Sequence, residues 1–341
     1  MTSGPTGGSG GPSADPWRRL RRHVVVAVAG AMALYVGLGV YGDAHSLTEL
    51  LEDFPWRTYP VVLALTLGNY AGRLVKWRWY LGLVGVDIGA RDASRVFGAG
   101  MTMVLTPGKA GELLKSYMVK NVTGTPMRVT APVVLAERLT DGLAMLLLAS
   151  VGDPHLLRLA AVVLGAMAAA VIVVQVRPLA LRLLGVGSRM PVVGRHVAGL
   201  SAFYESSYVL LRPRALAVAV GIGVVSWSLE GLAYYLILAG LGSPEAFETV
   251  MAAVFIFSIS AILGAVVATP GGLGGTEAGL VGLSQRILGL GRDSATAAAL
   301  VARFATLWFG VAIGLAALAA WPDLLDGGDA VHGGIAGGQA S

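Results

Sequence analysis

Long apolar runs, separated by short polar connections, fill most of the chain. Six of these runs are close to or above the roughly 20 residues that a helix needs to cross the hydrocarbon core of a bilayer. They cover residues 24–40, 59–75, 130–150, 156–176, 215–241 and 295–320. The pattern predicts an all-α polytopic membrane protein with six full transmembrane helices. The expected parts are a disordered tail over 1–16, a transmembrane domain over 17–322 and a flexible tail over 323–341.

Two further apolar stretches, residues 96–121 and 251–290, are interrupted near their middle by similar Pro-Gly motifs. The first motif reads Thr106-Pro107-Gly108-Lys109-Ala110-Gly111-Glu112, and the second reads Thr269-Pro270-Gly271-Gly272-Leu273-Gly274-Gly275-Thr276-Glu277. Each motif is followed by an apolar run with an arginine near its start, Arg138 in the first case and Arg303 in the second. The match predicts an internal repeat, with halves at about residues 23–150 and 215–320.

The basic residues gather in four segments of the chain, at 18–22, 73–95, 109–128 and 177–214. The other connections, at 41–58, 152–155, 242–250 and 291–294, together hold more acidic than basic residues. Because cytoplasmic loops are rich in Lys and Arg, the bias predicts cytoplasmic N- and C-termini in the plasma membrane. Residues 177–214 are then a basic cytoplasmic connection, in which 196–211 form either an amphipathic helix on anionic lipid or a solvated loop. A cleaved signal peptide at the N-terminus is the alternative to an uncleaved first helix.

With this orientation, the two broken stretches enter the bilayer from opposite sides. Proline lacks an N–H donor and glycine permits sharp turns, and backbone interrupted in this way cannot face lipid. Inverted repeats with interrupted helices are typical of transporters. The sequence therefore predicts two re-entrant hairpins in inverted repeats, with helix N-termini that can hold an anion such as phosphate. For a single motif, a surface loop between two short spanning helices would be the simpler interpretation.

Composition supports the membrane assignment and excludes several other classes of protein. Hydrophobic residues make up 55% of the 341 residues, charged residues make up 13%, and mean hydropathy is +0.71. Soluble domains carry about 25% charged residues, so an ordinary soluble enzyme, a disordered protein and a fibrous repeat are excluded. Cysteine is absent and the five histidines are scattered, so no metal site is predicted. Without a Walker motif or a dinucleotide fingerprint, no cofactor is predicted either, and the basic loops do not indicate nucleic-acid binding.

Seven ionisable residues fall inside apolar segments: Glu112, Glu137, Arg138, Asp141, Glu230, Glu277 and Arg303. Each unpaired charge costs about 2.5–3.5 kcal/mol at the bilayer centre, so these side chains are expected to face inward and pair. Glu137, Arg138 and Asp141 share one side of a helix, whereas Glu230 has no evident partner. The functional interpretation is a polar cavity in which Lys109, Arg138 and Arg303 face a phosphate. The acidic residues would neutralise the arginines or hold a cationic amine. The alternative is that Glu137, Arg138 and Asp141 form only a folding clamp.

The backbone of this cavity is expected to come from the broken motifs themselves, through Pro107, Gly108, Gly111, Pro270, Gly271, Gly272 and Gly274. A separate aromatic and basic cluster, Arg73, Lys76, Trp77 and Arg78, falls at the predicted cytoplasmic end of a helix. It is either an interfacial belt or a gate for lipid headgroups.

These residues carry a resemblance to a known family. The run from Arg73 through Thr106–Glu112 to Glu137, Arg138 and Asp141 resembles the lysylphosphatidylglycerol synthase transmembrane-domain family. The later Pro-Gly-Gly-Leu-Gly motif, with Glu277 and Arg303, resembles its second half, so the resemblance covers about residues 20–320. It implies a polytopic domain that translocates lipids, which in the best-known members are aminoacylated phosphatidylglycerols made by a fused soluble synthase. This chain ends at Ser341 with a glycine-rich tail, so we expect a stand-alone member without that synthase domain.

The sequence thus predicts transbilayer movement of an anionic or zwitterionic phospholipid, or of a polyprenyl-phosphate-linked lipid, by a protein that is not an enzyme. Two alternatives remain open. One is an integral membrane glycosyltransferase that uses a lipid-linked sugar, with Glu137 or Asp141 as base. The other is a non-catalytic membrane partner of a separate lipid synthase or glycosyltransferase, docked through residues 177–214.

Overall fold

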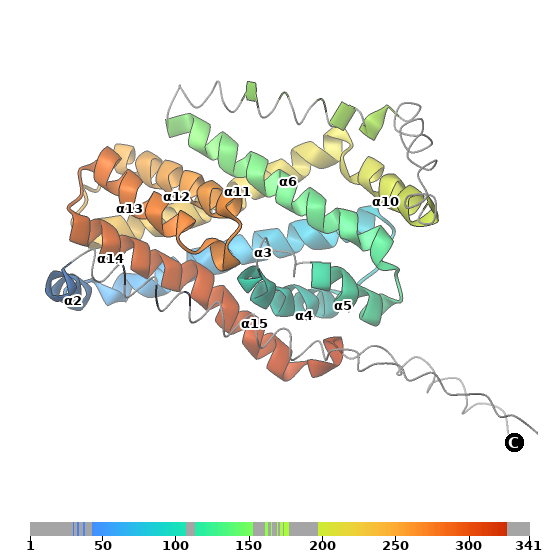
Figure 1. The fold of residues 1–341 in the computed structure, drawn as a ribbon, viewed down its shortest axis with the longest axis horizontal. Coiled ribbons are helices and arrows are strands. Elements are labelled where there is room, and N and C mark those ends of the chain that lie inside the picture. The colour runs from blue at the N-terminus through green and yellow to red at the C-terminus, as the bar shows by residue number, and fades with distance from the viewer. Residues whose placement is uncertain are drawn as a thin grey trace, which may run out of the picture.

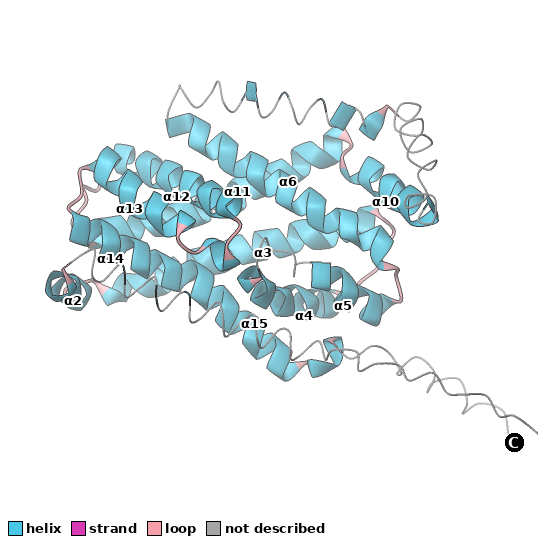
Figure 2. Cartoon of the chain, viewed as in Figure 1, coloured by secondary structure: helices cyan, strands magenta, loops and turns pink. Residues whose placement is uncertain are grey.

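A computed structural model describes residues 43–106, 113–152 and 197–325, together with isolated helical positions between 30 and 37 and between 161 and 176. Regular structure in these residues is entirely helical (Figure 2). Most of the predicted crossings at 24–40 and 156–176, the N-terminal tail, the C-terminal tail after Leu325 and the first motif from Pro107 to Glu112 lie outside the described residues. Within them, the all-helical class is confirmed.

The longer helices follow the predicted apolar runs, with short helices between them (Figure 1). In chain order they are α2 (Ala44–Glu52), α3 (Tyr59–Leu83), α4 (Ala90–Gly100), η2 (Met101–Leu105), α5 (Leu113–Thr123), α6 (Met127–Gly152), α10 (Val197–Leu210), α11 (Pro213–Gly240), α12 (Phe247–Val267), η4 (Pro270–Gly272), α13 (Gly275–Leu288), α14 (Arg292–Arg303), a π-turn η5 (Phe304–Trp308) and α15 (Phe309–Ala320). The 3-10 turns η1 (Trp56–Thr58) and η6 (Pro322–Leu324) complete the described elements. Of the two alternatives for 196–211, the structure has a helix, α10, which packs on α6.

Three described helices are long and apolar enough to cross a membrane. They are α11, α12 and the continuous helix formed by α14, η5 and α15 over Arg292–Ala320. The first and third correspond to the predicted crossings at 215–241 and 295–320. Helices α3 and α6 have 25 and 26 residues, which is also long enough, but they carry charged side chains in their interiors.

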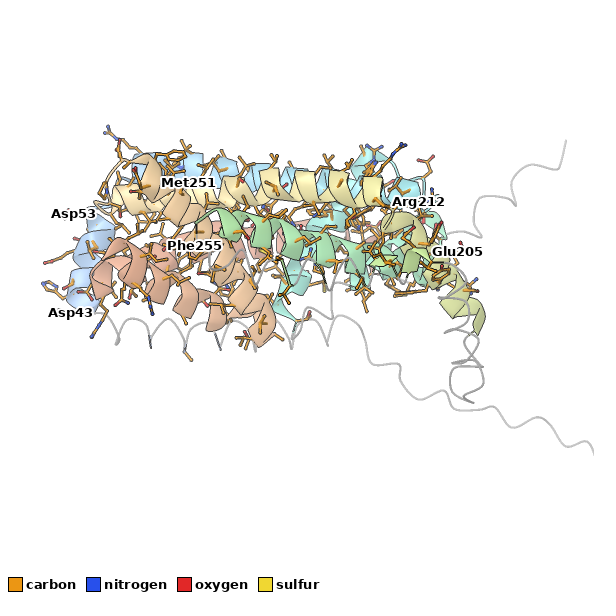
Figure 3. The ribbon with its side chains drawn as sticks, turned by 90° about the horizontal axis from the view of Figure 1, so that it is seen from above. Asp43, Asp53, Glu205, Arg212, Met251 and Phe255 are labelled. Carbon is orange, nitrogen blue, oxygen red and sulfur yellow. The ribbon has the colours of Figure 1, made fainter. Side chains whose placement is uncertain are left out.

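The described helices run between two polar ends of the molecule. One end holds α2, with Asp43 and Asp53, and the opposite end holds Glu205 and Arg212 (Figure 3). At the first end, the Asp43 N–H donates to an Asp293 carboxylate oxygen at 3.0 Å. At the second end, Arg95 pairs with Asp323 at 3.1 Å. We call these the acidic end and the basic end.

The second Pro-Gly motif forms the turn of a helical hairpin made by α12 and α13, which pack against each other. Ala268, Gly271, Gly272 and Gly274 all have positive φ in this turn, a conformation that costs a side chain about 1–2 kcal/mol and glycine very little. Helix α13 then runs back from the turn towards α14 and α2 at the acidic end (Figure 1). Its 14 residues extend about 21 Å, which is less than the roughly 30 Å of a hydrocarbon core.

The first broken stretch forms a second pair of short helices, α4 with η2 and then α5. Helices α4 and α5 have 11 residues each and pack against one another. Leu105, the last residue of η2, packs with Leu307 on the π-turn. A Cβ atom at Gly271 would lie 3.7 Å from Leu105. The two interrupted segments therefore meet inside the molecule.

Candidate functional site

A cavity of about 800 Å³ lies where the two halves meet. Its walls come from α3, α4, η2, α5 and α6 of the first half and from α11 to α15 of the second half. Most lining side chains are apolar, as is usual for ligand pockets. The charged lining residues are Arg73, Lys115, Arg138, Asp141, Glu230 and Arg303.

Three helices build a charged cluster on the first-half wall of this cavity. Helix α6 supplies Glu137, Arg138 and Asp141, helix α3 supplies Arg73 and Lys76, and helix α5 supplies Lys115. Glu137 accepts from Lys115 at 2.6 Å and from Arg138 at 2.7 Å, and Arg73 lies 3.5 Å away. Asp141 pairs with Lys76, with Arg138 at 3.4 Å and with Arg73 at 3.7 Å. We call these six residues the first-half cluster.

The first-half cluster has more positive than negative groups. Four cationic side chains surround two carboxylates, and both carboxylates are buried. Aromatic faces stabilise two of the cations. The Lys115 ammonium lies 5.4 Å from the Phe97 ring centre, and the Arg73 guanidinium lies 5.7 Å from that of Trp227. A buried surplus of positive charge beside a cavity suits an anionic group on a ligand.

The second-half wall carries a smaller cluster built on the Pro-Gly turn. Glu277 is the third residue of α13, and its carboxylate accepts from the Gly274 N–H at 2.8 Å, as in a capping box. The other oxygen of the carboxylate accepts from Arg303 Nε at 2.7 Å, and a second nitrogen of Arg303 donates to the Gly271 carbonyl at 2.6 Å. The guanidinium of Arg303 therefore links the Pro-Gly turn to the first turn of α13.

Comparison with known proteins identifies the family of this chain. The chain matches the sequence model of the lysylphosphatidylglycerol synthase TM region over residues 24–314. It belongs to this family.

A relative described as a "UPF0104 membrane protein", from Methanothermobacter thermautotrophicus, is 26% identical over 307 residues. The alignment covers 83% of this chain and 80% of the relative. The resemblance read from the motifs is thereby confirmed, and the chain is an integral membrane protein of a lipid-related family.

In this family member, the structure places most predicted charged residues in or beside one cavity. Arg138, Asp141, Glu230 and Arg303 line the cavity, and Gly271 and Gly272 of the second turn do too. Glu137 lies behind the wall and holds Lys115 and Arg138 in place. Pro270, Gly274 and Glu277 belong to the second turn and the start of α13. The predicted members of the first motif, Pro107, Gly108, Lys109, Gly111 and Glu112, lie outside the described residues.

The structure divides the predicted aromatic and basic cluster of α3 between two places. Lys76 and Trp77 are 0% and 1% exposed, so they lie in the core rather than at an interface. Arg73 reaches the cavity. Arg78 instead donates to the Ile88 carbonyl at 3.3 Å, near the basic end. Neither an interfacial belt nor a single gate describes all four residues, because successive positions on a helix face different sides.

Arg138 and Arg303 were each expected near the start of an apolar run, but both lie deeper in their helices. Arg138 lies near the middle of α6, and Arg303 lies near the middle of the helix Arg292–Ala320. Both helices begin in polar residues before the apolar run starts, so the apolar run understates the length of the helix.

Sequence reasoning missed three residues of the site: Tyr70, Lys115 and Trp227. The Tyr70 hydroxyl donates to the Thr306 carbonyl and joins α3 to the π-turn. A lysine inside the apolar stretch 96–121 was a signal for Lys115, since intramembrane charges are expected to pair. Trp227 gave no signal, because an aromatic residue in an apolar run fits any lipid-facing helix.

Among the described residues, no group of His, Asp and Glu side chains could hold a metal ion.

Proposed function

We propose that this protein moves a phospholipid or a polyprenyl-phosphate-linked lipid between the leaflets of the membrane. The lipid headgroup occupies the cavity while the acyl or prenyl chains stay in the bilayer. One observation carries the proposal: Arg138 of the first half and Arg303 of the second half line the same cavity. Each guanidinium presents its N–H donors in a planar fork, a geometry that matches phosphate oxygens.

The proposed architecture has six crossings and two re-entrant hairpins in inverted repeats. The hairpin of α12 and α13 starts and ends towards the acidic end, and α4 with α5 starts and ends towards the basic end. The short lengths of α4, α5 and α13 support this proposal, as does the contact of η2 with η4. Interrupted backbone at membrane depth is tolerated where it is enclosed by protein or lines a cavity.

The proposed orientation places the basic end in the cytoplasm of the cell and the acidic end outside the plasma membrane. Arg91 and Arg95 lie on α4 and Arg214 lies on α11, which both begin at the basic end, and Arg212 directly precedes α11. The excess of Lys and Arg on cytoplasmic loops supports this assignment. Both termini are then cytoplasmic.

The proposed roles follow from the contacts. Arg138 and Arg303 contact the phosphate, while Glu137 and Asp141 hold the cations of the first-half cluster. Glu277 braces the second turn. Lys109, which the sequence predicts to face the phosphate, and Glu112, predicted to support the first turn or the headgroup, keep these proposed roles.

Reconstitution tests the proposal. Vesicles containing the protein and acyl-chain-labelled fluorescent phosphatidylglycerol are treated with a membrane-impermeant quencher. We expect loss of inner-leaflet fluorescence to be at least about tenfold faster than in protein-free vesicles, the change produced by roughly 1.4 kcal/mol. Arg138→Gln is expected to lose this exchange, whereas Arg57→Gln, at an exposed site, keeps it.

Wild-type vesicles that behave like protein-free ones, for phosphatidylglycerol, phosphatidylcholine and a polyprenyl phosphate alike, would refute lipid movement. Product formation from a lipid-linked sugar without exchange would favour the glycosyltransferase instead.

A further inference from the structure

Glu230 on α11 is a buried acid that the proposed phosphate contacts leave unexplained. It is 4% exposed and lines the cavity. Glu137, Asp141 and Glu277 each have a cation within ion-pair distance. Across the described part of the chain, Glu230 has neither a hydrogen-bond donor nor a cation within the 4.0 Å that defines an ion pair. A buried carboxylate without a partner is costly, so its position indicates a ligand group.

The surroundings of Glu230 suit a cationic group. Trp227 lies one helical turn earlier on α11 and lines the same cavity, as do Tyr70 and Phe257. The Trp227 indole N–H has no acceptor among the residues that the structure describes. Arg73 and Arg303 attract Glu230, and Asp141 repels it. An aromatic wall beside a carboxylate is the arrangement that recognises ammonium groups.

The cavity therefore presents opposite charges to one occupant. The first-half cluster has a positive surplus on one wall, and α11 presents the Glu230 carboxyl group, whose ionised form a bound ammonium would stabilise. A headgroup with negative charge only would leave Glu230 uncompensated. A headgroup with both a phosphodiester and an ammonium would satisfy the two sites at once.

We propose that Glu230 binds the ammonium of a zwitterionic phospholipid headgroup, an inference that rests on the proposed lipid movement. The preferred substrate class is then a phosphodiester joined by a short linker to an amine or quaternary ammonium. A phosphatidylglycerol or a polyprenyl phosphate, which lacks the ammonium, moves more slowly.

The test compares two lipids that carry the fluorophore on an acyl chain, phosphatidylcholine and phosphatidylglycerol, in vesicles of the full chain. The wild type is expected to exchange phosphatidylcholine about tenfold faster than phosphatidylglycerol, the size of one charge-assisted contact. Glu230→Gln is expected to slow phosphatidylcholine about tenfold and not to slow phosphatidylglycerol, whose headgroup has no ammonium for Glu230 to bind. Glu230→Asp retains part of the preference, and the exposed Glu248→Gln serves as the charge-matched control.

The outcomes separate the two proposals. If the wild type exchanges neither lipid nor a polyprenyl phosphate, the proposed function fails and this inference fails with it. If it exchanges both lipids at equal rates, or if Glu230→Gln slows both equally, the ammonium site alone is overturned. Should Glu230→Gln not fold, thermal unfolding of the detergent-solubilised wild type decides. Short-chain phosphatidylcholine must then raise the unfolding midpoint more than short-chain phosphatidylglycerol, and equal shifts overturn the inference.

Discussion

Arg303→Ala is expected to abolish lipid exchange and to lower the free energy of unfolding by about 3–5 kcal/mol, the usual cost of breaking a buried ion pair. The substitution leaves the Glu277 carboxylate buried without its cation and removes the donor to the Gly271 carbonyl. It also removes the second-half contact proposed for phosphate. Exchange in vesicles and thermal unfolding in detergent measure the two effects separately.

A double variant distinguishes the two roles of Arg303. Arg303→Ala with Glu277→Ala removes both charges, so much of the lost stability is expected to return, because no unpaired charge stays buried. Exchange is expected to remain absent, since the phosphate contact is still missing. A folded double variant that exchanges lipid at the wild-type rate would contradict the role of Arg303 in binding.

Glu137→Gln is expected to be far more destabilising than Lys115→Gln, although the two residues form one ion pair. Glu137 neutralises Lys115, Arg138 and Arg73 together, so its loss leaves four cations around one carboxylate. We expect a cost of about 3–5 kcal/mol. Removal of Lys115 leaves Glu137 with two arginines and lessens the positive surplus, so its cost should be about 1–2 kcal/mol.

Thermal unfolding of both variants in the same detergent measures this asymmetry. The pair Glu137→Gln and Lys115→Gln in one chain should be more stable than Glu137→Gln alone. An equal loss of unfolding free energy in both single variants would show that the positive surplus of the first-half cluster does not affect stability.

The sequence predicted the class of fold because hydropathy depends on local composition. The runs at 215–241 and 295–320 became α11 and the helix Arg292–Ala320 with boundaries shifted by a few residues. The break at Pro270 was predictable for the same reason, since proline and clustered glycines interrupt a helix wherever they occur.

Contacts between distant segments were harder to predict. The pairing of Arg303 with Glu277 joins the successive helices α13 and α14. The sequence predicted only that acidic residues would neutralise the arginines, without naming this pair. The pairing of Lys76 with Asp141 depends on how α3 packs against α6, which hydropathy does not encode. Lys76 therefore resembled an interfacial residue although it is fully buried.

A cysteine introduced at Gly142 tests most directly whether the cavity is the route of the lipid headgroup. Gly142 lines the cavity, and a Cβ atom there meets no other atom within 4 Å. The chain has no cysteine of its own, so a bulky thiol reagent would modify this position alone. Gly282→Cys, on α13 and away from the cavity lining, is the matched control, because its Cβ also has open space. We expect modification to stop lipid exchange in Gly142→Cys and to leave it unchanged in Gly282→Cys. Undiminished exchange by fully modified Gly142→Cys would show that the headgroup does not pass through the cavity.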